Sequence, residues 1–173
     1  PMSYGNSFQR TTPIVLNLII INALVFLAQS ASGDMDQLNR VNDLFALHHY
    51  KSTEFRPYQL VTHMFMHGGL FHLLFNMLAL WMFGSMIERI WGPKRFLIFY
   101  LVCGLGAALA QLGSYTYDFW KIDHSTLSAD LYDQYQTALR LNCTVGASGA
   151  IMGVLAAFGY LFPNTKLFIM PIP

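Results

Sequence analysis

The sequence has few charged residues. Asp, Glu, Lys and Arg make up 11% of its 173 residues, whereas 54% are hydrophobic. A soluble domain has about 25% charged residues, so this deficit indicates a membrane protein. The formal net charge of +1 offers no strongly basic surface, and we expect no nucleic-acid partner.

Cysteine is also scarce. Cys103 and Cys143 are the two cysteines of the chain, which is too few for a disulfide framework. Cys103 lies in an apolar run and is expected to pack as a small apolar side chain. Cys143 lies in a loop, so we expect no disulfide between the two.

What the sequence does contain is a series of long apolar runs. A spanning helix needs about 20 mostly apolar residues, and Pro13 and Pro93 suit the first turn of such a helix. The expected spans are at about 13–31, 68–87, 93–112 and 147–162. The predicted fold is therefore an all-α, polytopic helical bundle in one membrane domain over residues 1–173. Its long loops cover residues 32–67 and 113–146.

Charge predicts the orientation of the bundle. Basic residues gather at one end of the expected spans: Arg10, Arg89, Lys94, Arg95 and Lys166. Eight of the nine acidic residues lie in the two long loops at the other end. The positive-inside rule then places the N-terminus in the cytoplasm and the long loops outside.

Two segments have further interpretations. Arg10, the apolar run after it and Ala28-Gln29-Ser30 resemble a secretory signal with its cleavage site, although the length of the run and the later spans favour a true span. Residues 127–141 predict a short amphipathic helix within the second long loop.

Ser148 lies at the start of the fourth run. From Ser148 to Phe162 a helix would be about 22 Å long, against a hydrocarbon core of about 30 Å, so the serine is expected below the outer membrane surface. The first N–H groups of a helix lack partners and can bind an oxyanion, and Gly146 and Gly149 would leave room for a substrate carbonyl. The alternative is that these glycines are ordinary helix-packing residues.

His72 and Asn76 interrupt the second run. They are four residues apart and therefore share one helix face. Polar side chains in a membrane are costly and indicate function, and both of these can donate hydrogen bonds to one anionic oxygen. The alternative is a pair of interhelical hydrogen bonds.

His63 and His67 are also four residues apart, a spacing that suits metal binding. Met64 stands where the zinc-protease motif His-Glu-x-x-His would need its Glu, and Phe65 follows it. A structural role near the outer face is the favoured interpretation, and a metal- or haem-binding membrane protein stays an alternative.

Taken in order, His63-x3-His67-x4-His72-x3-Asn76 and Gly146-x-Ser148-Gly149 resemble the rhomboid family of intramembrane serine proteases. Glu88-Arg89 and Gly92 also look like the family pattern. The resemblance runs from about residue 13 to residue 163.

The resemblance implies a function and a site. Ser148 would be the nucleophile, and the side chains of His72 and Asn76 would form the oxyanion hole with the backbone N–H groups of Ser148 and Ala147. The substrate would be a single-pass transmembrane protein, cut near its outer end in the bilayer. No cofactor or metal is implied. The location would be a bacterial inner membrane.

The chain departs from the family pattern in three ways. Six spans are expected, with the general-base histidine on the sixth, and no histidine of these residues matches it; we therefore interpret the chain as a fragment lacking the last spans. Tyr58-Gln59 replaces the usual Trp-Arg of the first loop. Met152 stands where many members have a Tyr that stacks on the base. The alternative function is a rhomboid-like pseudoprotease that binds transmembrane segments without cleaving them.

Overall fold

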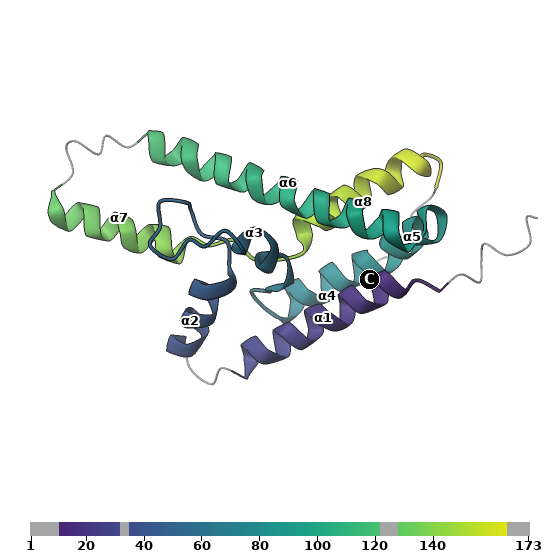
Figure 1. Cartoon of the computed structure of the whole chain (residues 1–173), viewed down its shortest axis with the longest axis horizontal. Coiled ribbons are helices and arrows are strands. Elements are labelled where there is room, and N and C mark those ends of the chain that lie inside the picture. The colour runs from purple at the N-terminus through teal and green to yellow at the C-terminus, as the bar shows by residue number, and fades with distance from the viewer. Residues whose placement is uncertain (1–10, 32–34, 122–127, 166–173) are drawn as a thin grey trace, which may run out of the picture.

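The structure is a computed structural model that describes residues 11–31, 35–121 and 128–165. These residues form helices and no strand (Figure 1). The elements are α1 (Pro13–Ser30), α2 (Met35–Phe45), α3 (Gln59–Thr62), the 3-10 turn η1 (His63–Phe65), α4 (Leu70–Ala79), the π-helical turn η2 (Leu80–Gly84), α5 (Ser85–Trp91), α6 (Pro93–Trp120), α7 (Ala129–Leu141) and α8 (Ser148–Leu161).

Three helices are long and apolar enough to cross a membrane. They are α1, the continuous helix Leu70–Trp91 formed by α4, η2 and α5, and α6 over Pro93–Tyr117. The fourth predicted span, α8, is a shorter apolar helix of 14 residues, about 21 Å long. The predicted helical membrane bundle is therefore confirmed.

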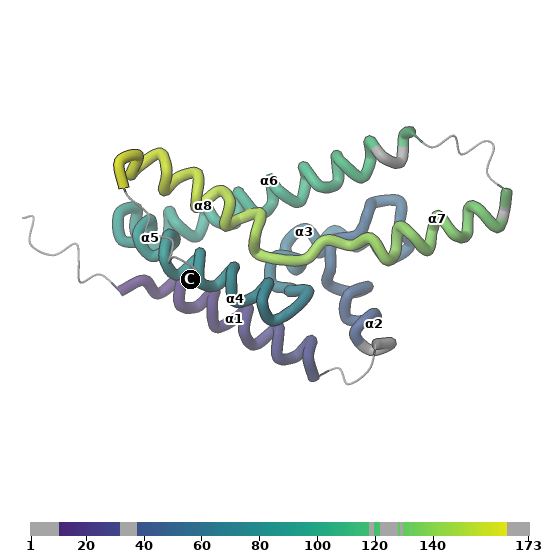
Figure 2. The backbone as a smooth tube through the Cα atoms, turned by 180° about the vertical axis from the view of Figure 1, so that it is seen from behind, coloured from purple at the N-terminus to yellow at the C-terminus, as the bar shows by residue number. Residues whose placement is uncertain are grey.

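The helix α6 continues beyond the predicted end of the third span at residue 112. Its 28 residues give a length of about 42 Å, which exceeds a hydrocarbon core of about 30 Å. The last turns of α6 therefore extend past the bundle, and α7 runs back toward the bundle in both views (Figures 1 and 2). The bounds of α7 confirm the amphipathic helix predicted over 127–141.

The helices α6 and α8 pack closely because small residues face each other. A Cβ atom at Gly149 would lie 2.4 Å from the Cβ of Ala107, and one at Gly153 would lie 2.4 Å from the Sγ of Cys103. Neither distance is sterically possible, so each position needs glycine. Ala107 lies where a side chain at Gly149 would point, which is the contact that the packing interpretation of this glycine expects.

A buried carboxylate joins α1 to α5. Glu88 is 1% exposed, and its two oxygens accept hydrogen bonds from the N–H groups of Ile14 at 3.0 Å and Val15 at 2.9 Å. A helix has unpaired N–H groups and a partial positive charge at its N-terminus, which compensate the buried negative charge. This cap fixes the predicted cytoplasmic end of the bundle, at the opposite end from Ser148.

Candidate active site

Ser148 is the first residue of α8 and is exposed, whereas Ala147 before it is fully buried. We call residues 142–147, which connect α7 to α8, the serine arm. Within the arm, Gly146 has φ +123°, a conformation that side chains rarely permit. The first N–H groups of α8 have no acceptor within the helix, so they lie beside the serine as free donors.

His72 of α4 meets Ser148 across Gly146. A Cβ atom at Gly146 would lie 2.9 Å from the Nε2 of His72, 2.8 Å from its Cε1 and 3.6 Å from the Oγ of Ser148. The imidazole edge therefore packs directly against Gly146, on the side where the hydroxyl of Ser148 also lies, and this close approach requires that residue 146 has no side chain.

A backbone hydrogen bond determines which nitrogen of His72 carries the proton. The N–H of Gly68 donates to Nδ1 of His72 at 3.4 Å, so Nδ1 acts as the acceptor. In a neutral imidazole the other nitrogen then carries the hydrogen. In this tautomer Nε2, which faces Gly146 and Ser148, is a hydrogen-bond donor.

Asn76 lies one turn further along α4, on the same face as His72. Its side chain is 7% exposed, and its Nδ2 donates to no acceptor within the described part of the chain. Buried donors are nearly always paired in folded proteins, so one that lacks a partner needs an explanation. An oxygen that binds only during a reaction would provide one.

His63 and His67 have structural contacts. The Nδ1 of His63 donates to the carbonyl of Gln59 at 2.8 Å, and the carbonyl of His63 accepts the N–H of Gly146 at 2.8 Å. Burial lowers the pKa of the His63 imidazole. Among the described residues, no three His, Cys, Asp or Glu gather into a metal site.

His67 packs against His72 with ring centroids 5.1 Å apart. Burial and the neighbouring His72 lower the pKa of His67 to about 4, against the opposing effect of the Phe65 carbonyl. The ring is therefore neutral at physiological pH. The backbone of His67 is held by Gln29 at the end of α1: its N–H donates to Oε1 at 3.0 Å, and its carbonyl accepts from Nε2 at 3.3 Å.

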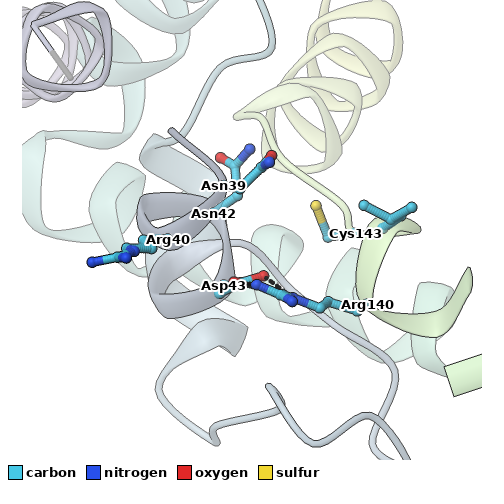
Figure 3. A pocket seen from close by; sticks show the side chains of 7 residues that line it. Asn39, Arg40, Asn42, Asp43, Arg140 and Cys143 are labelled. Carbon is cyan, nitrogen blue, oxygen red and sulfur yellow. Dashed lines mark hydrogen bonds and ion pairs between the residues drawn. The ribbon is translucent and has the colours of Figure 1, made fainter. Parts of the chain in front are cut away.

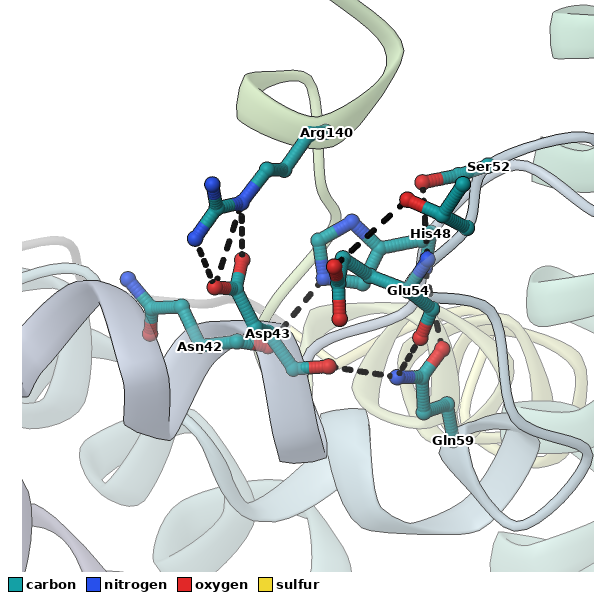
Figure 4. Close-up of polar contacts among 8 residues, drawn as sticks. Asn42, Asp43, His48, Ser52, Glu54, Gln59 and Arg140 are labelled. Atoms are coloured by element: carbon teal, nitrogen blue, oxygen red, sulfur yellow. Dashed lines mark hydrogen bonds and ion pairs between the residues drawn. The ribbon is translucent and has the colours of Figure 1, made fainter. Parts of the chain in front are cut away.

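Gln59 anchors the first outer loop. This fully buried side chain donates to the carbonyls of Asp43 at 2.9 Å and Glu54 at 2.8 Å (Figure 4). Its Oε1 accepts the N–H of Arg56 at 3.1 Å and that of His48 at 3.4 Å. The replacement of Trp-Arg by Tyr58-Gln59 therefore leaves the loop with an anchoring side chain, which sequence reasoning did not identify.

A polar cleft lies beside the serine arm, between α2 and α7. It has a volume of about 350 Å³ and is lined by Asn39, Arg40, Asn42, Asp43, Arg140, Leu141 and Cys143 (Figure 3). Across it the guanidinium of Arg140 donates to both carboxylate oxygens of Asp43, with Nε at 3.1 Å from Oδ1. Burial raises the pKa of the Cys143 thiol, which disfavours a reactive thiolate.

Comparison with known proteins identifies the family of this chain. Residues 54–173 match the family model described as Rhomboid domain. The chain belongs to the rhomboid family. It is an integral membrane protein, and the resemblance inferred from the histidine, asparagine and serine motifs is confirmed.

Several curated rhomboid proteins are 30–34% identical to this chain over the residues that align. Rhomboid protease GluP of Bacillus subtilis is 34% identical over 116 residues, which cover 66% of this chain and 18% of GluP. Rhomboid protease AarA of Providencia stuartii is 32% identical over 146 residues, or 83% of this chain and 49% of AarA. The mitochondrial RHOMBOID-like protein 12 of Arabidopsis thaliana is 30% identical over 166 residues, which cover 92% of this chain and 46% of that protein. The chain spans less than half the length of these relatives.

Proposed function

We propose that this chain carries the nucleophile and the oxyanion hole of an intramembrane serine protease. The observation that carries the proposal is that the Nε2 of His72 and the Oγ of Ser148 both lie against the same side of Gly146. A peptide carbonyl that binds between these two groups would have the nucleophile on one side and a hydrogen-bond donor on the other, which is the arrangement that acyl transfer requires.

In the proposed reaction, Oγ of Ser148 attacks the carbonyl carbon and its proton passes to a general base. The carbonyl oxygen becomes an oxyanion, which accepts hydrogen bonds from Nε2 of His72, Nδ2 of Asn76 and the N–H groups of Ser148 and Ala147. Collapse of the intermediate breaks the peptide bond, the amine leaves with a proton from the base, and water later releases the acyl group from Ser148.

In this proposal His72 is a hydrogen-bond donor and not the base, because the bond from the N–H of Gly68 to its Nδ1 favours the tautomer that is protonated at Nε2. The family resemblance assigns the base to a histidine of a sixth span, which the six histidines of these residues do not include. The proposed substrate is a single-pass transmembrane protein. The proposed setting is a bacterial inner membrane, with the N-terminus in the cytoplasm.

The test is cleavage of a model single-pass substrate by the natural protein in liposomes, together with labelling by a fluorophosphonate probe. Ser148→Ala should abolish both while the protein keeps its thermal stability. Ser85→Ala is the matched control, because Ser85 is a buried serine of α5 whose Oγ has no partner among the described residues; its activity should be that of the wild type.

Cleavage retained by Ser148→Ala would refute the assignment of the nucleophile. A wild-type protein that binds the substrate but neither cleaves it nor reacts with the probe would favour the rhomboid-like pseudoprotease.

A further inference from the structure

The backbone of the serine arm is held by the first outer loop. Thr144 and Leu47 form an isolated antiparallel bridge in which each N–H donates to the other's carbonyl at 2.9 Å. The N–H of Gly146 donates to the carbonyl of His63 at 2.8 Å. These bonds fix the path of the arm relative to the loop but do not join it to a membrane span.

A side-chain hydrogen bond joins the arm to α6. The Oγ1 of Thr144 lies 2.7 Å from the Oη of Tyr115, in a partly buried contact between residues that are 29 positions apart. The Tyr115 ring also meets the edge of the His49 ring, with centroids 6.1 Å apart. The hydroxyl of Tyr115 is therefore held at a fixed place at the junction of α6, the first outer loop and the arm.

Thr144 lies four residues before Ser148, and the glycine between them makes the connection sensitive to its attachment. Gly146 has no side chain that would restrict rotation about its backbone, so the orientation of Ser148 depends on the bonds that hold the arm, and the loss of a bond at Thr144 can change it. Catalytic groups need positions accurate to about 0.5 Å and 10–20°. Errors of about 1 Å have large effects on rate.

We propose that Tyr115 and Thr144 are positioning residues that orient Ser148 toward the donors of α4. This inference rests on the proposed role of Ser148 as nucleophile. Neither hydroxyl touches the space between Ser148 and His72, so the pair acts through the arm and takes no part in proton transfer. Its loss should therefore lower kcat and leave KM unchanged, since substrate binding does not depend on the angle of the serine.

The experiment compares Tyr115→Phe, Thr144→Val and the double variant with Thr144→Ser, which keeps the hydroxyl. One neutral hydrogen bond corresponds to about 0.5–1.5 kcal/mol, so each single variant should lose roughly 3–10-fold in kcat and in the rate of fluorophosphonate labelling. The double variant should lose no more than a single one, because both changes remove the same bond. Thr144→Ser should restore the wild-type rate.

Tyr117→Phe is the matched control. Tyr117 lies two residues further along α6, is 58% exposed and packs on Lys121; the loss of its hydroxyl should change neither rate nor thermal stability. A fall in kcat for this variant would mean that the loss of a tyrosine hydroxyl near the end of α6 lowers the rate whether or not it bonds to the arm, which contradicts the proposal.

The proposal is overturned by an unchanged kcat in both single variants, by additive losses in the double variant, or by a lower melting temperature with unchanged kcat. If Thr144→Val does not fold, Tyr115→Phe and Thr144→Ser decide by themselves. The outcome is separable from the proposed function. Activity retained by Ser148→Ala removes the nucleophile, whereas an inactive Ser148→Ala beside a fully active Tyr115→Phe removes only the positioning role.

Discussion

The two sides of the candidate site are built in different ways. On one side, His72 and Asn76 project from the regular helix α4, and their common face follows from helix geometry alone. On the other side, Ser148 follows an irregular arm whose path depends on Leu47, Tyr115 and His63. A position on a helix is fixed by neighbours in sequence, but a position at the end of an arm is fixed by residues far away in sequence.

Among the residues around Ser148, the largest effect is expected on the helix side. His72→Ala or Asn76→Ala should each lower kcat roughly 10–10³-fold, because each removes one donor to the oxyanion, and neither should change the melting temperature much. Single-turnover kinetics on a transmembrane substrate measures this. Asn22→Leu is the control, since the Asn22 amide donates within its own helix to Leu18 at 2.7 Å. Normal turnover in both α4 variants would return these residues to packing roles.

An intermediate effect is expected where the two sides meet. Gly146→Ala should lower kcat about 10–10²-fold, because its Cβ would displace either the His72 ring or the arm, and errors of this size weaken a catalytic geometry. It should also lower the melting temperature, because φ +123° at this position strains an alanine.

Gly159→Ala is the matched control for this variant, because a Cβ atom there meets nothing within 4 Å. An alanine in a helix is more stable than a glycine, so this control should unfold no earlier than the wild type. Equal activity for the two alanine variants would show that the close approach of His72 to Gly146 is not needed.

The smallest effect is expected at the end of α7, just before the serine arm begins. Arg140 pairs with Asp43, but the Arg140 side chain is 48% exposed, and exposed ion pairs contribute about 0.2–1 kcal/mol. Arg140→Asp and Asp43→Arg should therefore each lower kcat by about two- to fivefold, and the double charge swap should recover it. Steady-state kinetics at low and high salt measures this, because salt screens the pair. A double swap that is no better than the single variants would show that the pair does not hold the arm.

The contrast between the helix side and the arm side also explains which features could be predicted from the sequence. The spans follow from hydropathy, and the pairing of His72 with Asn76 follows from their spacing. The function of Gly149 was open in the sequence, because a glycine that packs on Ala107 and one that borders a substrate look alike. The bonds from Tyr115 to Thr144 and from Asp43 to Arg140 join residues 29 and 97 positions apart, and neither has a local pattern that predicts it.

Gln59 and Gln29 show a different limit. Both are uncharged polar residues, and their types suggest surface positions, yet each is buried and bonded to backbone groups of other segments. For Gln29, its place near the end of an apolar run is the one local feature of the sequence that indicates burial.

The π-helical turn η2 has a consequence for how one span contacts both ends of the bundle. A π turn takes up about one residue more than an α turn, and each residue advances an α-helix by about 100°. If residues 70–91 formed an uninterrupted α-helix with His72 in its present place, Glu88 would be rotated by about 100° and would miss the amides of Ile14 and Val15. A single-residue deletion within 80–84 should thus be tolerated, because both ends stay in phase. A single-residue insertion there should rotate Glu88 relative to His72, so that the two side chains could not both keep their present contacts.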